Sequence, residues 1–218
     1  GKRILQAAEP SGVPDFIFTK YDDVLIYEKD LVNVGKIGRR WFGEQFNIND
    51  NQTFDFSIPN LDLSVPVAAK INFASKSFAN TSFEIRSNNQ VIGNVAIAAI
   101  PLSSGLEGFE NVLNTTFTSA TTNVAINLVY NNGGVPSSNG YLNFIQLKTK
   151  RNLIGFGEQF SFFNDLEAVN IGVGQYSFTN ATQIAEVWDV TDRFNVTNYI
   201  NTSGANYDFK VNLGTTKK

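Results

Sequence analysis

Cysteine and histidine are both absent from the 218 residues of this chain. Without them the chain cannot assemble by itself a Cys–His dyad, a Ser–His–Asp triad or a zinc site that uses histidine. The absence of cysteine also excludes disulfide bonds, and it leaves the redox compartment open. We therefore expect this chain to be non-catalytic and to hold no cofactor and no metal. Methionine is absent as well, and because the chain starts at Gly1, we expect a processed or excised piece of a longer protein.

Charge and long apolar runs are also scarce. Charged residues make up 17% of the chain and the net charge is −3, whereas nucleic-acid binders usually present a basic face. The longest uninterrupted apolar run, Val95–Ile100, has six residues, and a membrane-spanning helix needs about twenty. These features argue against nucleic acid as a partner and exclude a helical membrane span. The apolar fraction of 42% is nevertheless enough to fill a core.

The apolar residues recur with a period of two, which is typical of half-buried strands. Phe54, Phe56 and Ile58 alternate with polar residues, and the segment from Tyr207 to Leu213 alternates in the same way. Asn, which favours turns, occurs 27 times. We expect strands over 15–20, 24–28, 53–58, 65–73, 82–87, 91–97, 123–130, 141–149, 159–163, 175–179, 186–190 and 207–213, and one short helix over 106–113. This pattern predicts an all-β fold, an antiparallel β-sandwich that resembles a jelly roll.

The predicted domain boundaries follow shifts in composition along the chain. Short strands from an upstream β module, followed by a connector, are expected over residues 1–38. The β-sandwich domain is expected over 39–213. The remaining residues, 214–218, are expected to be a linker.

The segment Gly38–Glu44 combines two guanidinium groups, an indole and a carboxylate, in Arg39, Arg40, Trp41 and Glu44. These groups can clamp an anion or a peptide carboxylate. Alternatively, one arginine stacks on Trp41 and pairs with Glu44 at the edge of the sandwich. Both interpretations make the segment a candidate docking or structural site.

A second candidate segment contains Trp188, Asp189 and Asp192. With a period of two, Trp188 and Val190 share a face, so we expect Trp188 to be a buried core anchor and Asp189 to point away from the core. Asp189 and Asp192 are also close enough in sequence for a paired-carboxylate acid and base site. The alternative is a structural role in the turn that follows the strand.

An oxygen-rich cluster is formed by Asn47, Asn49, Asp50 and Asn51. Such side chains can ligate calcium, but the spacing and the terminal glutamate of an EF-hand are absent. A solvated turn is the alternative.

Three stretches in this order carry a resemblance to a known family. They are Tyr27–Leu31, Gly38–Glu44 and Val187–Val196, with Gly1–Ile4 before them and Asn139–Leu142 between the last two. Together they resemble the signal peptidases and sortases of the type IX secretion system of Bacteroidota, the PorU-type proteins, in the region before the gingipain-like cysteine peptidase domain. One departure is Arg193, where a proline is expected after Thr191 and Asp192.

The resemblance implies a parent protein on the cell surface, at the outer face of the outer membrane. Such a parent removes the C-terminal sorting domain from secreted cargo and attaches the cargo to a lipopolysaccharide anchor. Its catalytic Cys and His belong to the downstream domain, so no catalytic residue carries over to this chain. The implied partners are that peptidase domain, an outer-membrane barrel protein and cargo proteins.

The alternative is a stand-alone carbohydrate-binding or adhesin sandwich. Sugar-binding sandwiches present exposed Trp or Tyr platforms, whereas this chain has 19 Phe, 7 Tyr and 2 Trp. A surplus of Phe favours core filling or an apolar docking interface between domains over sugar stacking.

Overall fold

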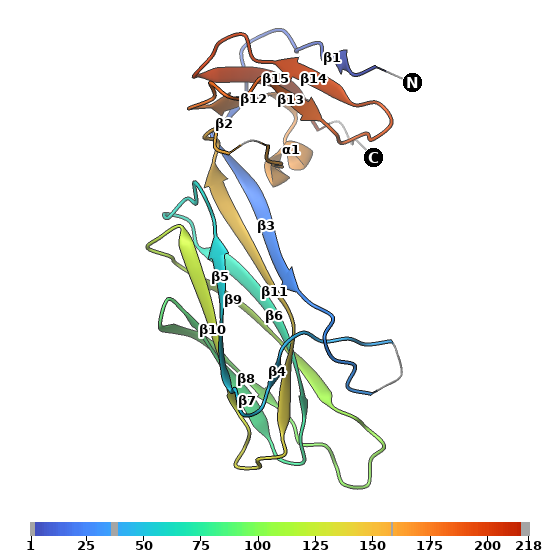
Figure 1. Cartoon of the computed structure of the whole chain (residues 1–218). Coiled ribbons are helices and arrows are strands. Elements are labelled where there is room, and N and C mark those ends of the chain that lie inside the picture. Colours follow the sequence, from blue (N-terminus) through green and yellow to red (C-terminus); the bar gives the residue numbers. More distant parts are fainter. Residues whose placement is uncertain (1–2, 36–38, 158, 215–218) are drawn as a thin grey trace. The chain divides into compact units, whose positions relative to one another are not determined.

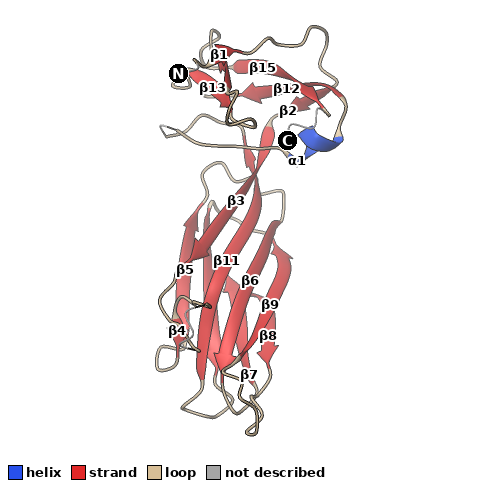
Figure 2. Cartoon of the chain, turned by 90° about the vertical axis from the view of Figure 1, so that its right-hand side faces the viewer, coloured by secondary structure: helices blue, strands red, loops and turns tan. Residues whose placement is uncertain are grey.

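The computed structural model describes residues 3–35, 39–157 and 159–214. It is almost entirely β, which confirms the predicted fold class (Figure 1). Figure 2 shows the strands and the single helix of the described residues, and none of those residues forms a helix long and apolar enough to span a membrane. The strands are β1 (Leu5–Gln6), β2 (Phe16–Phe18), β3 (Lys20–Glu28), β4 (Gln45–Phe46), β5 (Asn51–Ser57), β6 (Val67–Lys76), β7 (Thr81–Ser87), β8 (Gln90–Ile97), β9 (Phe109–Phe117), β10 (Asn123–Asn131), β11 (Asn139–Asn152), β12 (Gly172–Phe178), β13 (Glu186–Asp189), β14 (Thr197–Ile200) and β15 (Tyr207–Leu213), and the helix is α1 (Asp165–Val169).

The chain divides into two compact units. Unit 1 combines Gly1–Asp23 with Lys150–Lys218, and unit 2 is the continuous segment Val24–Thr149. This division differs from the predicted boundaries, because the expected break after residue 38 falls inside unit 2. The N-terminal strands complete a unit that the C-terminal third of the chain forms, so unit 2 is an insertion in sequence terms. Of the predicted linker only Gly214 is described, and residues 215–218 lie outside the described residues.

Unit 2 has the strand order of a jelly roll. One sheet runs β5-β10-β7-β8, and the other runs β3-β11-β6-β9 with β4 paired to β11. The first long strand, β3, thus lies beside the last, β11, and the second, β5, lies beside the last but one, β10, as in a jelly roll. The turn between β7 and β8 consists of Asn88 and Asn89, both with positive φ (46° and 71°). Asn tolerates this conformation, and a two-residue turn of this kind joins antiparallel strands tightly.

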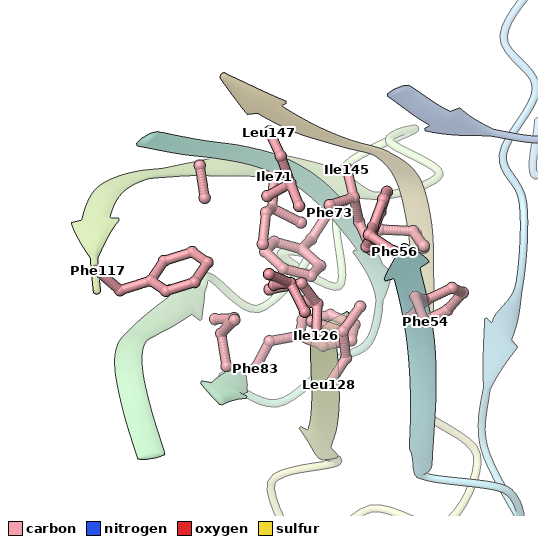
Figure 3. Packing of buried hydrophobic residues seen from close by; sticks show 14 of the residues in the cluster. Phe54, Phe56, Ile71, Phe73, Phe83, Phe117, Ile126, Leu128, Ile145 and Leu147 are labelled. Atoms are coloured by element: carbon pink, nitrogen blue, oxygen red, sulfur yellow. The ribbon is translucent and has the colours of Figure 1, made fainter. Parts of the chain in front are cut away.

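The two sheets of unit 2 enclose one large apolar core. Figure 3 shows the aromatic centre of this core, where Phe83 is fully buried. Its ring lies 4.4 Å from that of Phe73, 4.9 Å from that of Tyr130 and 5.1 Å from that of Phe46, measured between centroids. A Cβ atom on Gly140 would lie 2.6 Å from Phe83 Cζ. Gly140 is therefore required where β11 passes the aromatic centre.

Unit 1 contains two small sheets. In the first, β14 lies between β1 and β13, pairing in parallel with β1 and antiparallel with β13. In the second, β12 lies between β15 and β2, and its pairing with β2 is parallel. Parallel pairs between distant segments leave no turn signal in the sequence, because they need long connections.

A buried arginine helps to hold unit 1 together. Arg151 lies at the end of β11, and its Nη1 donates to Asp23 Oδ2 at 2.7 Å. Its guanidinium also lies 5.4 Å from the ring centroid of Tyr21 and 4.7 Å from that of Phe156. Arg151 therefore connects the N-terminal segment to the C-terminal segment of unit 1.

Two predicted elements are wrong. Residues 109–117, which overlap the expected helix, form β9, because Leu113 and its neighbours pair with β6 along the whole strand. The helix of the described residues is α1 instead, where Asn164 caps the first turn by accepting from Leu166 N at 3.0 Å. The expected strand over 159–163 does not form either, because Phe160 and Phe162 pack into the core of unit 1 and only Phe163 makes a bridge, with Asp22.

Candidate functional site

An open cavity of about 540 Å³ lies within unit 1. Its lining comes from residues 159–163, from helix α1, from strands β12 to β15 and from the chain on both sides of β13. Pockets that bind small ligands usually have volumes of about 300–1,000 Å³. The cavity is therefore large enough for a side chain or a small molecule.

The walls of the cavity are aromatic. Phe162 packs against Tyr176 and Phe178 of β12, with centroid distances of 5.4 Å to each. Phe160, Tyr199 and Phe209 also line the cavity. Two of the lining rings, those of Phe163 and Trp188, are exposed.

Three carboxylates line the same cavity, those of Glu167, Glu186 and Asp189. Each accepts from a neutral donor. The Tyr176 hydroxyl donates to Glu167 at 2.8 Å, the side-chain amide of Asn198 donates to Glu186, and the backbone N–H of Thr191 donates to Asp189 at 3.0 Å.

The tyrosines of the cavity carry raised pKa values. Burial raises the pKa of Tyr199 to about 12, and the charge of Asp189 and then that of Glu167 act in the same direction. Burial also raises the pKa of Tyr176, followed by the charge of Glu167 and the hydrogen bond to it. Burial and the neighbouring negative charges both disfavour the charged phenolate form of these tyrosines.

Helix α1 and its cap position Glu167 at the cavity. Asp22 Oδ2 accepts from Asp165 N at 2.9 Å, which ties the first turn of α1 to the N-terminal segment. The Asn164 cap fixes the same turn. Glu167 then reaches Tyr176 on β12, so one carboxylate is held against the aromatic wall.

The prediction that Trp188 is a buried anchor is wrong, because 48% of this residue is exposed. Val187 takes the inward position on β13 and packs against the core of unit 1. A strand that shifts its phase by one residue exchanges its two faces. Trp188 therefore lies at the cavity, and Val190, its predicted neighbour in the core, is also exposed.

Asp189 and Asp192 occupy different places. Asp189 lines the cavity, whereas Asp192 is not among the lining residues and caps the next turn. Asp192 accepts from Phe194 N at 2.9 Å and from Asn195 Nδ2 at 2.6 Å. The structure thus gives both carboxylates turn contacts and does not bring them to one site as an acid and base pair.

The candidate residues of the segment 39–44 contact different partners in unit 2. Arg40 forms a bidentate pair with Glu110, with Nε at 2.9 Å, and its guanidinium lies 5.5 Å from the ring centroid of Phe42. Glu44 instead accepts from the Tyr27 hydroxyl and lies 3.2 Å from Lys29 Nζ. The expected contacts from arginine to Trp41 and Glu44 are replaced by these.

Trp41 and Arg39 both lie at the surface, and 43% of Trp41 is exposed. Gly38, which begins this segment, lies outside the described residues. The four candidates from this segment thus form no common clamp.

In the oxygen-rich cluster of Asn47, Asn49, Asp50 and Asn51, the side chains of Asn47 and Asn51 make hydrogen bonds within unit 2. Asn47 Nδ2 donates to Asn139 at 2.6 Å, and Asn51 Oδ1 accepts from Asn127 at 2.6 Å. In the described part of the chain, no three acidic residues gather in a way that could hold a metal ion.

Several cavity residues were missed by the sequence analysis. Phe160 and Phe162 lie in a segment that was expected to be a strand, and Glu167 lies in a helix that was not expected. The available signal was Asn164 followed by acidic residues, which marks the start of a helix. It would have placed Glu167 on a helix but not at the cavity.

Comparison with known proteins supports the fold. No protein-family profile matches the sequence, and no curated protein matches it significantly. Among solved structures, the dimeric latent PorU of Porphyromonas gingivalis matches with a TM-score of 0.79 and 15% identity, over 96% of this chain and 20% of that chain. The present chain thus spans about a fifth of that protein and has the fold of a region of it.

Two carbohydrate-binding modules match less well. A family 35 module from Clostridium thermocellum matches with a TM-score of 0.34 and 12% identity, over 59% of this chain and 95% of that chain. A family 36 module in complex with calcium and xylotriose matches with a TM-score of 0.36 and 16% identity, over 60% of this chain and 99% of that chain. Scores at this level carry no argument about function.

Proposed function

We propose that this chain is a non-catalytic β module of a PorU-type surface peptidase and sortase. In this role it belongs to a parent that removes the C-terminal sorting domain of type IX secretion cargo and attaches the cargo to a lipopolysaccharide anchor. The module supports and docks the peptidase domain at the outer face of the outer membrane. Its further partners are an outer-membrane barrel protein and the cargo.

The observation that carries the proposal is the extent of the structural likeness. It covers 96% of the chain and therefore includes strands of both units. A jelly roll alone is shared by many unrelated proteins. The insertion of a jelly roll into a second β unit is a more specific arrangement. The absence of Cys and His agrees with a module that leaves the chemistry to another domain.

An apolar strip on unit 1 is a candidate for the docking surface. Leu166 and Val169 are three residues apart on α1, where residues share a face, and Ile171 follows the C-cap residue Asn170. All three are exposed, and α1 has no buried residue. Docking between domains of one chain typically buries about 600–1,500 Å² and is centred on apolar contacts with a polar rim.

The parent gene gives the first test. The proposal expects the reading frame that contains these residues to encode a downstream domain with a Cys and a His. Hydrogen exchange then compares the isolated chain with the parent protein. We expect slower exchange around Leu166, Val169 and Ile171 in the parent, whereas equal exchange at every described strand and at α1 would mean that the module does not dock.

The exposed Trp188 favours a second candidate, a stand-alone carbohydrate-binding or adhesin sandwich. An exposed indole in the wall of a cavity can stack on a sugar ring. A reading frame with a glycoside hydrolase domain or stalk repeats, in place of a peptidase domain, would support this candidate.

A further inference from the structure

Strand β13 contributes to the wall of the cavity of unit 1. Every residue from Gln183 to Thr191 lines it. Four of these residues, Glu186–Asp189, form β13, and the others precede or follow it directly. β13 is also the last strand in the order β1-β14-β13, and no described strand pairs with its outer edge. An extended peptide can add to an edge of this kind through main-chain hydrogen bonds.

The negative charge of the cavity favours a peptide with a cationic side chain. Glu167, Glu186 and Asp189 line the cavity, and none of the described lining residues is Lys or Arg. An acidic or phosphorylated ligand would be repelled by the three carboxylates. A purely apolar ligand would remove them from water without supplying a counter-charge, which is costly.

The aromatic rings favour the same choice. Trp188 and Phe163 are exposed at the cavity, and Phe160 and Phe162 are half-buried in its wall. The face of an aromatic ring attracts a cation, most strongly for Trp. Rings and carboxylates around one cavity therefore complement an ammonium or guanidinium group on an apolar stem.

We propose that this cavity binds the side chain of a lysine or arginine in an extended peptide that adds to the outer edge of β13. The carboxylates neutralise the charge, Trp188 covers the side chain, and the backbone of β13 pairs with the peptide backbone. The raised pKa of Tyr199, to which Asp189 and Glu167 contribute, agrees with a negative potential in the cavity. This inference concerns the cavity alone and does not depend on the proposed function.

Titration of the 218-residue chain with short peptides tests the proposal. The Trp41→Phe variant leaves Trp188 as the sole fluorescent indole. The probe is a blocked pentapeptide of sequence Thr-Val-Lys-Val-Thr, compared with the same peptide carrying Gln or Glu in place of Lys. We expect the Lys peptide to change the emission of Trp188 in a saturable way, and the Gln peptide to bind at least about tenfold more weakly. N-methylation of the valine after the lysine removes a backbone donor and should weaken binding as well.

Two pairs of variants separate the cavity from the rest of the chain, with binding measured by calorimetry. Asp189→Asn keeps the shape of the side chain and should weaken binding of the Lys peptide about tenfold, whereas Asp192→Asn, in the next turn, should leave it unchanged. Trp188→Ala should weaken binding to a similar extent, and Trp41→Ala, a similarly exposed indole in unit 2, should not.

Equal binding of the Lys and Gln peptides would overturn the proposal, and so would equal effects of Asp189→Asn and Asp192→Asn. Xylo-oligosaccharides provide the remaining comparison. A saturable response of Trp188 to them, together with no response to the Lys peptide, would also overturn the proposal and would assign the cavity to sugar binding. These outcomes leave the link to a peptidase domain untouched, because that link is tested on the parent gene and on α1.

Discussion

Replacement of Phe83 by Ala should severely destabilise unit 2. Phe83 is 0% exposed and contacts three rings from other strands at centroid distances between 4.4 and 5.1 Å. Buried Phe→Ala changes cost about 3–5 kcal/mol, and aromatic pairs add about 0.5–1.5 kcal/mol each beyond their buried area. We therefore expect a loss near the upper end, about 4–5 kcal/mol of the free energy of unfolding.

Thermal unfolding measures this loss. For a domain of this size, 1 kcal/mol lowers the Tm by roughly 3–4 °C, so Phe83→Ala should lower it by about 12–20 °C. A Trp188→Phe background leaves Trp41 as the fluorescent reporter of unit 2. The matched control is Phe78→Ala, since Phe78 is 62% exposed and its loss should cost about 0.5 kcal/mol or less. An equal decrease in the Tm of both variants would contradict the burial of Phe83 at the aromatic centre of the jelly roll.

Two further substitutions probe unit 1, and a change of pH probes the tyrosines of both units. Trp188→Ala should cost less than about 1 kcal/mol in urea unfolding, because the indole is half-exposed; a loss of 3 kcal/mol or more, about that of a buried ring, would return Trp188 to the core. Arg151→Met should cost about 3 kcal/mol, because it leaves Asp23 without its buried partner, and an unchanged Tm would refute that pairing. In all seven tyrosines burial raises the pKa. Their contribution to stability is therefore complete below pH 10.0, the unfolded value, and is lost as the pH rises through about 12, the folded value of Tyr21 and Tyr199. Phenolate absorbance and unfolding should appear together above pH 10, and full ionisation near pH 10 in a folded chain would contradict this.

Many of the strands could be predicted because their signals are local. The strand from Tyr207 to Leu213 was expected from alternation alone and forms with those bounds. The Asn88–Asn89 turn lies between the expected strands over 82–87 and 91–97, and it has the positive φ values that Asn tolerates. Local periodicity and turn chemistry thus carry the fold class.

The phase of β13 could not be predicted from its sequence. Val187, Trp188 and Val190 are all apolar, so alternation fits either face of the strand. The structure turns Val187 inward and leaves Trp188 at the cavity, because only the smaller side chain packs against the unit 1 core. This choice depends on distant residues and not on the segment itself.

The assembly of the cavity depends on long-range contacts in the same way. Residues 159–163, α1 and β13 come together only in the folded unit, and no local pattern marks that meeting. Arg40 likewise pairs with Glu110, which is 70 residues away in the sequence, and not with the nearby Glu44. The partners of the candidate residues therefore lay beyond the reach of sequence patterns.

Processing of cargo in the cell tests most directly whether the module supports a PorU-type peptidase. The parent protein carries either Val169→Asp with Ile171→Asp, on the exposed apolar strip at the end of α1, or Val13→Asp, an equally exposed apolar site elsewhere in unit 1. Mass spectrometry then measures the share of secreted cargo that keeps its sorting domain, at equal levels of folded parent protein. The account predicts that unprocessed cargo accumulates with the double variant and not with Val13→Asp. Complete processing with both variants would contradict it.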